Sequence, residues 1–284
     1  MTQPAWFQLT VEAPQEVREA LALLLTEWGA GGVVEETRAV SAYFPPAARA
    51  ELDARLERYA GDLGQRVVWS WSAVTEGWED AWKAHFRPAV LSRRLAVCPS
   101  WERFEPHSPD VRVIRMDPGR AFGTGTHETT RLCLGLLDDA IGDAPPPTLL
   151  DVGCGSGILT VGARLLGVPR AVALDIDPLA ASATRENALG NGVADGVLVL
   201  CGDLRSVGGA YPLVVANILY QVLLGLAPAL AARVAPGGRL VLSGMLTPEL
   251  ASAAAVYGAQ GLQETRLVSA GEWGALVFQR RPAG

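Results

Sequence analysis

Three glycines on alternate positions, directly after a short apolar run, constrain this chain more than any other feature. The run Leu149–Val152 is interrupted only by Asp151, and Gly153, Gly155 and Gly157 follow it at once. The residues after the last glycine have the apolar spacing of a helix. The pattern predicts a strand, a tight turn and a helix. A turn without side chains lets a ligand approach the unpaired N–H groups at the helix end, as in a nucleotide site.

The spacing of the glycines distinguishes between nucleotide ligands. A dinucleotide-binding turn has glycines at its first, third and sixth positions, whereas the sixth position counted from Gly153 is Ile158. A second acidic residue, Asp175, ends the next apolar run, Ala171–Leu174, where an acceptor for ribose hydroxyls is expected. Ribose recognition without a pyrophosphate site favours S-adenosylmethionine as the cofactor. Cys154, inside the turn, is predicted to fill space, because no histidine is near it in sequence.

Length and charge narrow the class of protein further. A chain of 284 residues is long enough for two domains, and 49% hydrophobic with 19% charged residues is typical of a globular protein. The formal net charge of -6 argues against direct nucleic-acid binding, which needs a basic surface. A positively charged partner suits this chain better.

The cysteines and apolar runs predict a cytoplasmic protein without a metal site. The four cysteines are widely separated and form no CxxC pair, and only three histidines are available to complete a metal site. Reduced thiols fit the cytosol. The chain shows neither a basic leader with an apolar core nor an apolar run of about 18 residues, so we expect neither secretion nor membrane insertion.

Residues 1–74 have the pattern of a small α+β domain of the ferredoxin-like type. Period-two and helical spacings alternate in the order βαββαβ, which is the split-βαβ arrangement. The six predicted elements are strand 6–11, helix 16–28, strands 32–36 and 40–44, helix 47–59 and strand 67–74. Six basic side chains stand against ten acidic ones, a net charge of -4. Solubility alone explains such a charge, but beside a cofactor domain we expect a module that holds a basic substrate.

A linker helix and a hairpin are predicted between this module and the glycine turn. Residues 75–90 carry two tryptophans and His85 on one helical face, and we expect these rings to pack rather than to perform chemistry. The catalytic domain is expected to span residues 91–284. Its first strands, 95–99 and 111–116, are predicted to form a hairpin around a loop rich in proline and charged residues.

The segment 117–130, DPGRAFGTGTHETT, is the second informative stretch. It contains three glycines and four hydroxyl residues before an apolar helix. Such a loop is able to close over a ligand, with Phe122 as an apolar cover and Thr130 offering a hydroxyl and a backbone donor. The alternative is a plain surface turn with a threonine cap. His127 is predicted to be a neighbour of the cap rather than a base.

Two later strand ends carry polar side chains suited to a ligand. Asp203 follows the strand Val197–Cys201 and is either an acceptor for an adenine amine or the cap of a turn. Asn217 follows the buried strand Leu213–Ala216 and is expected in the ligand crevice of an open α/β sheet. Its side-chain carbonyl is able to accept a hydrogen bond from an amine.

The rest of the chain completes an open α/β sheet. The closing pair of strands is predicted to form an antiparallel edge on an otherwise parallel sheet. The expected elements are helices 178–189 and 222–234, strand 239–243, helix 248–257, and strands 262–269 and 273–279.

Three motifs carry a resemblance to known enzymes. LDVGCGSG, with DID at Asp175–Asp177, resembles the class I S-adenosylmethionine-dependent methyltransferases. DPGRAFGTGTHETT, together with ANIL at Ala216–Leu219, closely resembles the bacterial methyltransferase family of large-subunit ribosomal protein L11. The resemblance spans most of residues 76–284, whereas the first seventy or so residues resemble the family's substrate-recognition domain in pattern only.

The resemblance implies an α/β enzyme with a Rossmann-like seven-stranded sheet and a small N-terminal domain. It implies methyl transfer from S-adenosylmethionine to lysine side-chain amines and the N-terminal α-amine of ribosomal protein L11. Matching the motifs places cofactor contacts at Thr130, Gly153, Asp175 and Asn217. The residues themselves add Gly155 and Asp203, and Asn217 is the candidate catalytic residue because its carbonyl would align the incoming amine.

Other functions fit the sequence less well. Enzymes that methylate base amines often carry Asn-Pro-Pro-aromatic where this chain has Asn217-Ile218-Leu219-Tyr220, and the N-terminal module lacks a basic stripe. A small-molecule methyltransferase would not need that module. A catalytically silent cofactor-binding or assembly protein is the alternative from a different class.

Overall fold

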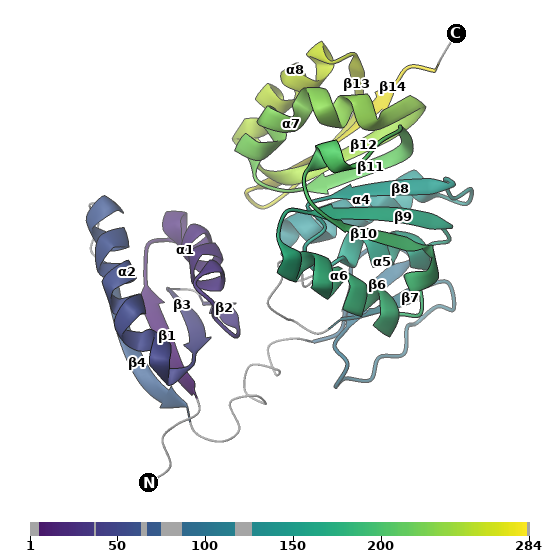
Figure 1. The fold of residues 1–284 in the computed structure, drawn as a ribbon. Helices are drawn as coiled ribbons and strands as arrows, with labels where there is room; N and C mark the ends of the chain where they lie inside the picture. The colour runs from purple at the N-terminus through teal and green to yellow at the C-terminus, as the bar shows by residue number, and fades with distance from the viewer. Residues whose placement is uncertain (1–5, 37, 64–66, 75–86, 117–126, 283–284) are drawn as a thin grey trace. The chain divides into compact units, whose positions relative to one another are not determined.

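The computed structural model describes residues 6–36, 38–63, 67–74, 87–116 and 127–282. The chain divides into two compact units, an N-terminal unit of residues 1–86 and a C-terminal unit of residues 87–284 (Figure 1). No helix among the described residues is long and apolar enough to cross a membrane.

The N-terminal unit has the predicted ferredoxin-like arrangement. Its sheet has the order β2-β3-β1-β4 with antiparallel neighbours. The elements are β1 (Trp6–Glu12), α1 (Gln15–Glu27), β2 (Val33–Glu35), β3 (Ala39–Phe44), α2 (Arg49–Leu63) and β4 (Val68–Val74). Leucines at helical spacing, Leu21 with Leu25 and Leu52 with Leu56, are fully buried or nearly so. They form this unit's own hydrophobic core with the inner face of β1.

The C-terminal unit is built on a seven-stranded sheet of the order β10-β9-β8-β11-β12-β14-β13. Neighbouring strands from β10 to β12 are parallel, and β14 is antiparallel to both β12 and β13, so the predicted antiparallel edge is confirmed. The strands are β8 (Thr148–Val152), β9 (Arg170–Asp175), β10 (Val197–Cys201), β11 (Tyr211–Asn217), β12 (Val234–Leu246), β13 (Leu262–Ala270) and β14 (Trp273–Arg280).

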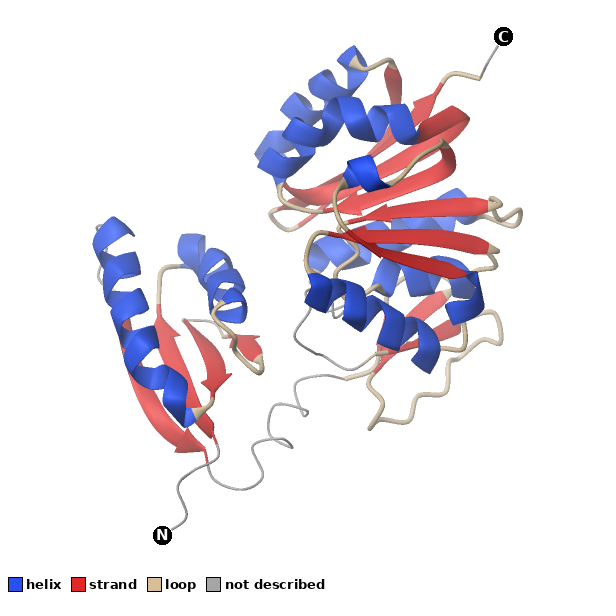
Figure 2. Cartoon of the chain, in the orientation of Figure 1, coloured by secondary structure: helices blue, strands red, loops and turns tan. Residues whose placement is uncertain are grey.

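Helices cover both faces of this sheet, which gives the three-layer architecture of an α/β fold (Figures 1 and 2). The helices are α4 (Glu128–Ile141), α5 (Ile158–Leu165), α6 (Pro178–Gly190), α7 (Tyr220–Arg233) and α8 (Leu250–Ala259). The cores on the two faces are separate: one takes residues from α4, α5 and α6, and the other takes residues from α7 and α8. The predicted fold class is confirmed.

A small three-stranded sheet precedes α4 and corrects one expectation. Its strands are β5 (Ala89–Val90), β6 (Leu95–Cys98) and β7 (Arg112–Arg115). Strands β6 and β7 pair in parallel, so the predicted hairpin is wrong. Residues 99–111 are long enough for the chain to cross back before β7 begins, which a parallel pair requires.

The predicted linker helix at 75–90 falls mostly on residues 75–86, which lie outside the described residues. Its last positions belong to strand β5 instead of a helix, because Ala89 and Val90 pair with β6. The domain limits 1–74, 75–90 and 91–284 remain a prediction.

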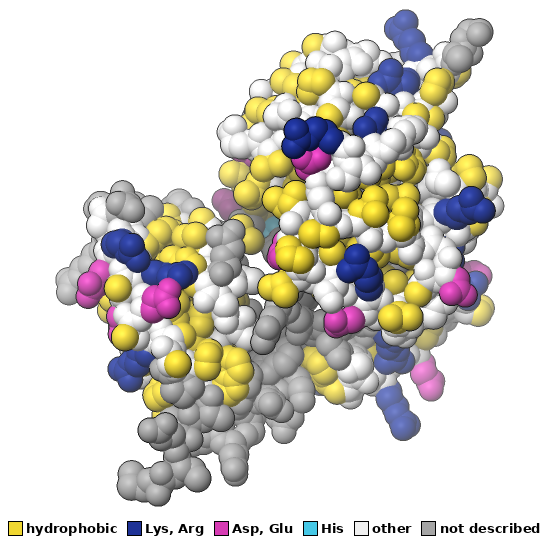
Figure 3. Space-filling model, in the orientation of Figure 1, with side chains coloured by type: hydrophobic (Ala, Val, Ile, Leu, Met, Phe, Trp, Pro, Cys, Tyr) yellow, Lys and Arg dark blue, Asp and Glu magenta, His cyan; other side chains and the backbone are white. Residues whose placement is uncertain are grey.

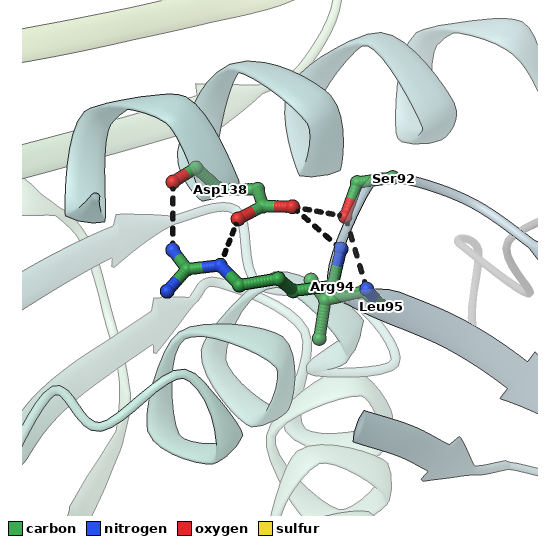
Figure 4. Close-up of polar contacts among 4 residues, drawn as sticks. All are labelled: Ser92, Arg94, Leu95 and Asp138. Atoms are coloured by element: carbon green, nitrogen blue, oxygen red, sulfur yellow. Dashed lines mark hydrogen bonds and ion pairs between the residues drawn. The ribbon is translucent and has the colours of Figure 1, made fainter. Parts of the chain in front are cut away.

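A buried carboxylate fixes α4 to the turn between β5 and β6 (Figure 4). Asp138, which is 1% exposed, accepts hydrogen bonds from Ser92 Oγ at 2.7 Å and from the Arg94 backbone N at 2.9 Å. Its second oxygen accepts from Arg94 Nε at 2.6 Å. Burial alone would raise the pKa of Asp138, but the hydrogen bonds from Ser92 and Arg94 outweigh it and lower that pKa.

We predict that Asp138→Asn destabilises the C-terminal unit by about 3–5 kcal/mol, because it leaves the Arg94 charge without its buried partner. Urea unfolding of the variant checks this value. The folded-state pKa of Asp138 lies below that of the unfolded chain. Its contribution is therefore complete above about pH 4 and is lost as the pH falls through the folded-state value.

Asp139→Asn is the matched control. The neighbouring carboxylate forms an ion pair with Arg266 at 2.5 Å, but both side chains are about half exposed. Exposed pairs contribute at most about 1 kcal/mol. Equal losses in the two variants would contradict the assigned role of Asp138.

Candidate functional site

The structure brings three of the predicted site residues together at the carboxyl ends of adjacent strands of the large sheet. Gly153 directly follows β8, Asp175 ends β9 and Asn217 ends β11. The strands are in register, since Val152 pairs with Leu174 on one side and with Ala216 on the other. The carboxyl ends of these strands therefore meet around the glycine turn, where open α/β sheets bind ligands.

The glycine turn is held in a conformation that only glycine adopts readily. Gly153, Gly155 and Gly157 have φ angles of +74°, +54° and +81°. Gly153 N donates to the Leu174 carbonyl at 2.8 Å. A Cβ added at Gly153 would lie 2.2 Å from Ile218 Cγ2. The chain after β11 thus packs directly on the turn, and both the φ angle and the space exclude a side chain.

Asp175 links the turn to the end of β9. One of its oxygens accepts from Gly155 N at 2.9 Å, and the other accepts from Asp177 N at 3.0 Å. A carboxylate offers about four acceptor positions, so these two bonds leave capacity for the hydroxyls of a ribose.

Asn217 and a further candidate, Thr130, each present a buried polar atom that lacks a partner among the described residues. These atoms are Oδ1 of Asn217 and Oγ1 of Thr130, the latter in the first turn of α4. Buried polar atoms nearly always have hydrogen-bond partners, so these two oxygens are candidate acceptors for the donor groups of a ligand. The residues present therefore fit a polar ligand lying along the glycine turn.

Asp151, two residues before Gly153, is a buried acid that the sequence pattern did not mark as a candidate. It is fully buried in β8, and Oδ2 accepts from Thr160 Oγ1 at 2.7 Å, whereas Oδ1 has no partner in the described part of the chain. Burial, reinforced by the charge of Asp175, raises the pKa of Asp151 to about 7. An acid inside an otherwise apolar strand was the available signal, because such a group is costly unless a partner compensates it.

Apolar side chains surround these strand ends. Ile176 and Leu179, after β9, are 78% and 59% exposed, and Leu219, after β11, is 61% exposed. Figure 3 shows that hydrophobic side chains gather in patches on one face of the C-terminal unit. Exposed apolar residues next to unpaired polar atoms are typical of a binding site that excludes water when it is filled.

Asp203 shows the contacts of a turn cap. It is the N-cap of a 3-10 helix at Leu204–Ser206 and accepts from Arg205 N at 2.9 Å and from Arg205 Nε at 2.8 Å. The hydrogen bonds from Arg205 lower the pKa of this exposed carboxylate. Capping was one of the two alternatives for this residue, and its contact with an adenine amine remains a prediction.

The expectations for Cys154 and His127 agree with the structure. Cys154 is buried beside Thr184 Oγ1 at 3.2 Å, and burial raises the pKa of its thiol, which makes it a poor nucleophile. His127 is the N-cap of α4 and accepts from Thr129 N through Nδ1 at 3.3 Å. Most of the segment 117–130, which ends in the first turn of α4, lies outside the described residues: these are residues 117–126, including Phe122. His85 also lies outside them.

Comparison with known proteins places this chain in a family. The family model described as ribosomal protein L11 methyltransferase (PrmA) matches residues 5–281. This chain belongs to that family. Its fold is that of the class I methyltransferases, whose cofactor is S-adenosylmethionine. The unpaired acceptors and the bare glycine turn fit that cofactor.

Individual relatives match this chain over almost the full length of both sequences. A ribosomal protein L11 methyltransferase from Pelobacter propionicus is 37% identical over 305 residues, which cover 97% of each chain. One from Pelotomaculum thermopropionicum is 39% identical over 304 residues and covers 96% of this chain and 98% of its own. The crystal structure of a ribosomal protein L11 methylase from Lactobacillus delbrueckii subsp. bulgaricus is 36% identical, with a TM-score of 0.64. It covers 69% of this chain and 100% of that one.

We predict that Gly153→Ala weakens S-adenosylmethionine binding by more than about tenfold, because the new methyl group displaces Ile218 from the turn. Isothermal titration calorimetry measures this. Gly237→Ala is the matched control, since Gly237 has almost the same φ angle, +75°, but no atom within 4 Å of an added Cβ. Both variants lose about 1–2 kcal/mol to the backbone conformation. Equal cofactor affinity in the two would contradict the prediction.

Proposed function

We propose that this protein transfers methyl groups from S-adenosylmethionine to lysine side-chain amines and to the N-terminal α-amine of ribosomal protein L11, in the cytoplasm. The main support for the proposal is the match of residues 5–281 to the ribosomal protein L11 methyltransferase family. The net charge of -6 suits a basic protein substrate better than a nucleic acid. The four free cysteines fit a reducing compartment.

The geometry of the strand ends supports the proposed cofactor contacts. Gly153 and Gly155 let the cofactor lie against the backbone of the turn, and Asp175 accepts from its ribose hydroxyls. Thr130 and Asn217 offer their unpaired oxygens to its polar groups. When bound, S-adenosylmethionine supplies a sulfonium methyl group that is already activated for transfer.

Asn217 is proposed to align the target amine. Its Oδ1 has no partner among the described residues and lies at the end of β11 beside the turn. By accepting an N–H of the substrate, this oxygen would direct the nitrogen lone pair towards the methyl group. Displacement by an amine mainly requires this alignment and a dry site.

The amine must be neutral before it reacts. Burial lowers the pKa of a lysine, and a positive charge next to it lowers that pKa further. The exposed apolar residues Ile176, Leu179 and Leu219 would supply the dry surroundings. No dedicated base is required for this reaction. His127, which caps α4 through Nδ1, is therefore not assigned that role.

The function is tested by offering several acceptors at once. The purified enzyme is incubated with methyl-labelled S-adenosylmethionine and fractionated ribosomal proteins, ribosomal RNA or small-molecule fractions. Label on lysines and the N-terminus of protein L11, located by mass spectrometry, is the expected result. Label confined to RNA or to a small molecule would refute the proposal, and binding of cofactor without any transfer would indicate a silent binding protein.

We predict that Asn217→Ala lowers kcat, because it raises the activation free energy by about 2–4 kcal/mol. Cofactor affinity should change little. The hydrogen bond to the reacting nitrogen should strengthen as positive charge develops there. Single-turnover rates at saturating cofactor and substrate measure this effect. Near-normal rates with weakened cofactor binding would show that Asn217 only holds the cofactor.

A further inference from the structure

A surface groove of about 510 Å³ runs between α4 and β13 in the C-terminal unit. Its lining is apolar in the middle and charged at both ends. Leu132, Gly135 and Leu136 line it from one face of the helix, and Val268 lines it from the strand. The groove is separate from the glycine turn, whose residues do not line it.

The two ends of the groove differ. Asp139 and Arg266 form an ion pair of 2.5 Å at one end. Glu128 and Ala270 lie at the other end, because the ring of His127, next to Glu128, contacts the ring of Trp273, which pairs with Ala270. Strand β13 is antiparallel to β14, which is antiparallel to β12, so β13 points the same way as β11. The end with Glu128 and Ala270 therefore lies on the side of the sheet where β11 and its parallel neighbours have their carboxyl ends, and where Asn217 ends β11.

The strand that borders the groove is the last one in the sheet order, so its outer edge has no neighbouring strand among the described residues. Such an edge presents unpaired N–H and C=O groups to an extended peptide. Because β13 both lines the groove and forms the edge of the sheet, an extended peptide in the groove would lie next to that edge.

The end nearest Asn217 carries exposed carboxylates. Glu128 begins α4, and Glu272 lies in the turn after β13. The ring of His127, next to Glu128, contacts the ring of Trp273, next to Glu272, with centroids 5.0 Å apart. This contact holds the start of α4 beside the turn that contains Glu272, so two carboxylates stand at this end. Glu128 lines the groove itself, and so does Arg131, one turn further along α4. This end complements a basic segment.

Gly135 keeps the middle of the groove open. Glycine is the least favourable residue in a helix interior apart from proline. A Cβ added at Gly135 would meet no atom within 4 Å. Folding therefore does not require glycine at this position, and any larger side chain would project into the groove.

We propose that this groove holds an extended, basic segment of the protein substrate and leads its target amine to the site at Asn217. The inference rests on the proposed function, since it places the substrate of that reaction. The groove sets substrate affinity rather than the chemical step, because none of its lining residues belongs to the cofactor site.

The test is to fill the groove and to measure methyl transfer to ribosomal protein L11 with labelled S-adenosylmethionine. Gly135→Leu should raise KM for the protein about tenfold or more, while kcat and cofactor affinity stay within about twofold of the wild type. This pattern is expected when a contact that binds substrate and transition state equally is lost. Gly135→Ala keeps the groove open and should behave as the wild type. Gly225→Leu is a second control, because Gly225 lies in α7, outside the groove, with no atom within 4 Å of an added Cβ.

The outcomes separate the two proposals. An active Gly135→Leu enzyme with the KM of the wild type would overturn the groove as a substrate path and leave the proposed function intact. A wild-type enzyme that transfers no methyl group to ribosomal protein L11 would overturn both. If Gly135→Leu changed the sedimentation coefficient but not KM, the occupant would be a second copy of this chain, and the substrate proposal would be wrong.

Discussion

The close approach of the chain after β11 to the glycine turn after β8 is the constraint on which the site depends. Ile218 occupies the space that a side chain at Gly153 would need, and the Leu174 carbonyl accepts from the turn on its other side. The turn is therefore clamped between two neighbouring strand ends. This clamp sets where Asp175 and Asn217 stand relative to the backbone that a ligand would contact.

The same packing brings two carboxylates close together beneath the turn. Asp151 is buried below it and Asp175 borders it, so two carboxylates share a small region of low polarity. The buried one holds its proton to higher pH, while the outer one is stabilised by backbone N–H groups. A positively charged ligand would be favourable here because it offsets the charge that burial makes costly.

The sequence predicted the parts of this fold that local patterns encode. Period-two and helical spacing identified the elements of both units, and the glycine turn with Asp175 identified the cofactor. Local patterns do not encode the pairing of distant segments: β6 and β7, expected to form a hairpin, run in parallel. The contact of Arg94 with Asp138, and the lack of a partner for Asp151 Oδ1 among the described residues, also depend on tertiary packing, which no local spacing reports.

The hydrophobic cores of the two units share no residue, and this bears on how the chain folds. The N-terminal unit pairs strands within its own 86 residues, so it can fold as soon as it leaves the ribosome. The C-terminal unit must first bring β8 beside β11, with β9 and β10 between them in sequence. Such non-local parallel pairing is slow. Unfolding of the whole chain should therefore not be two-state, and the small unit should regain its structure first.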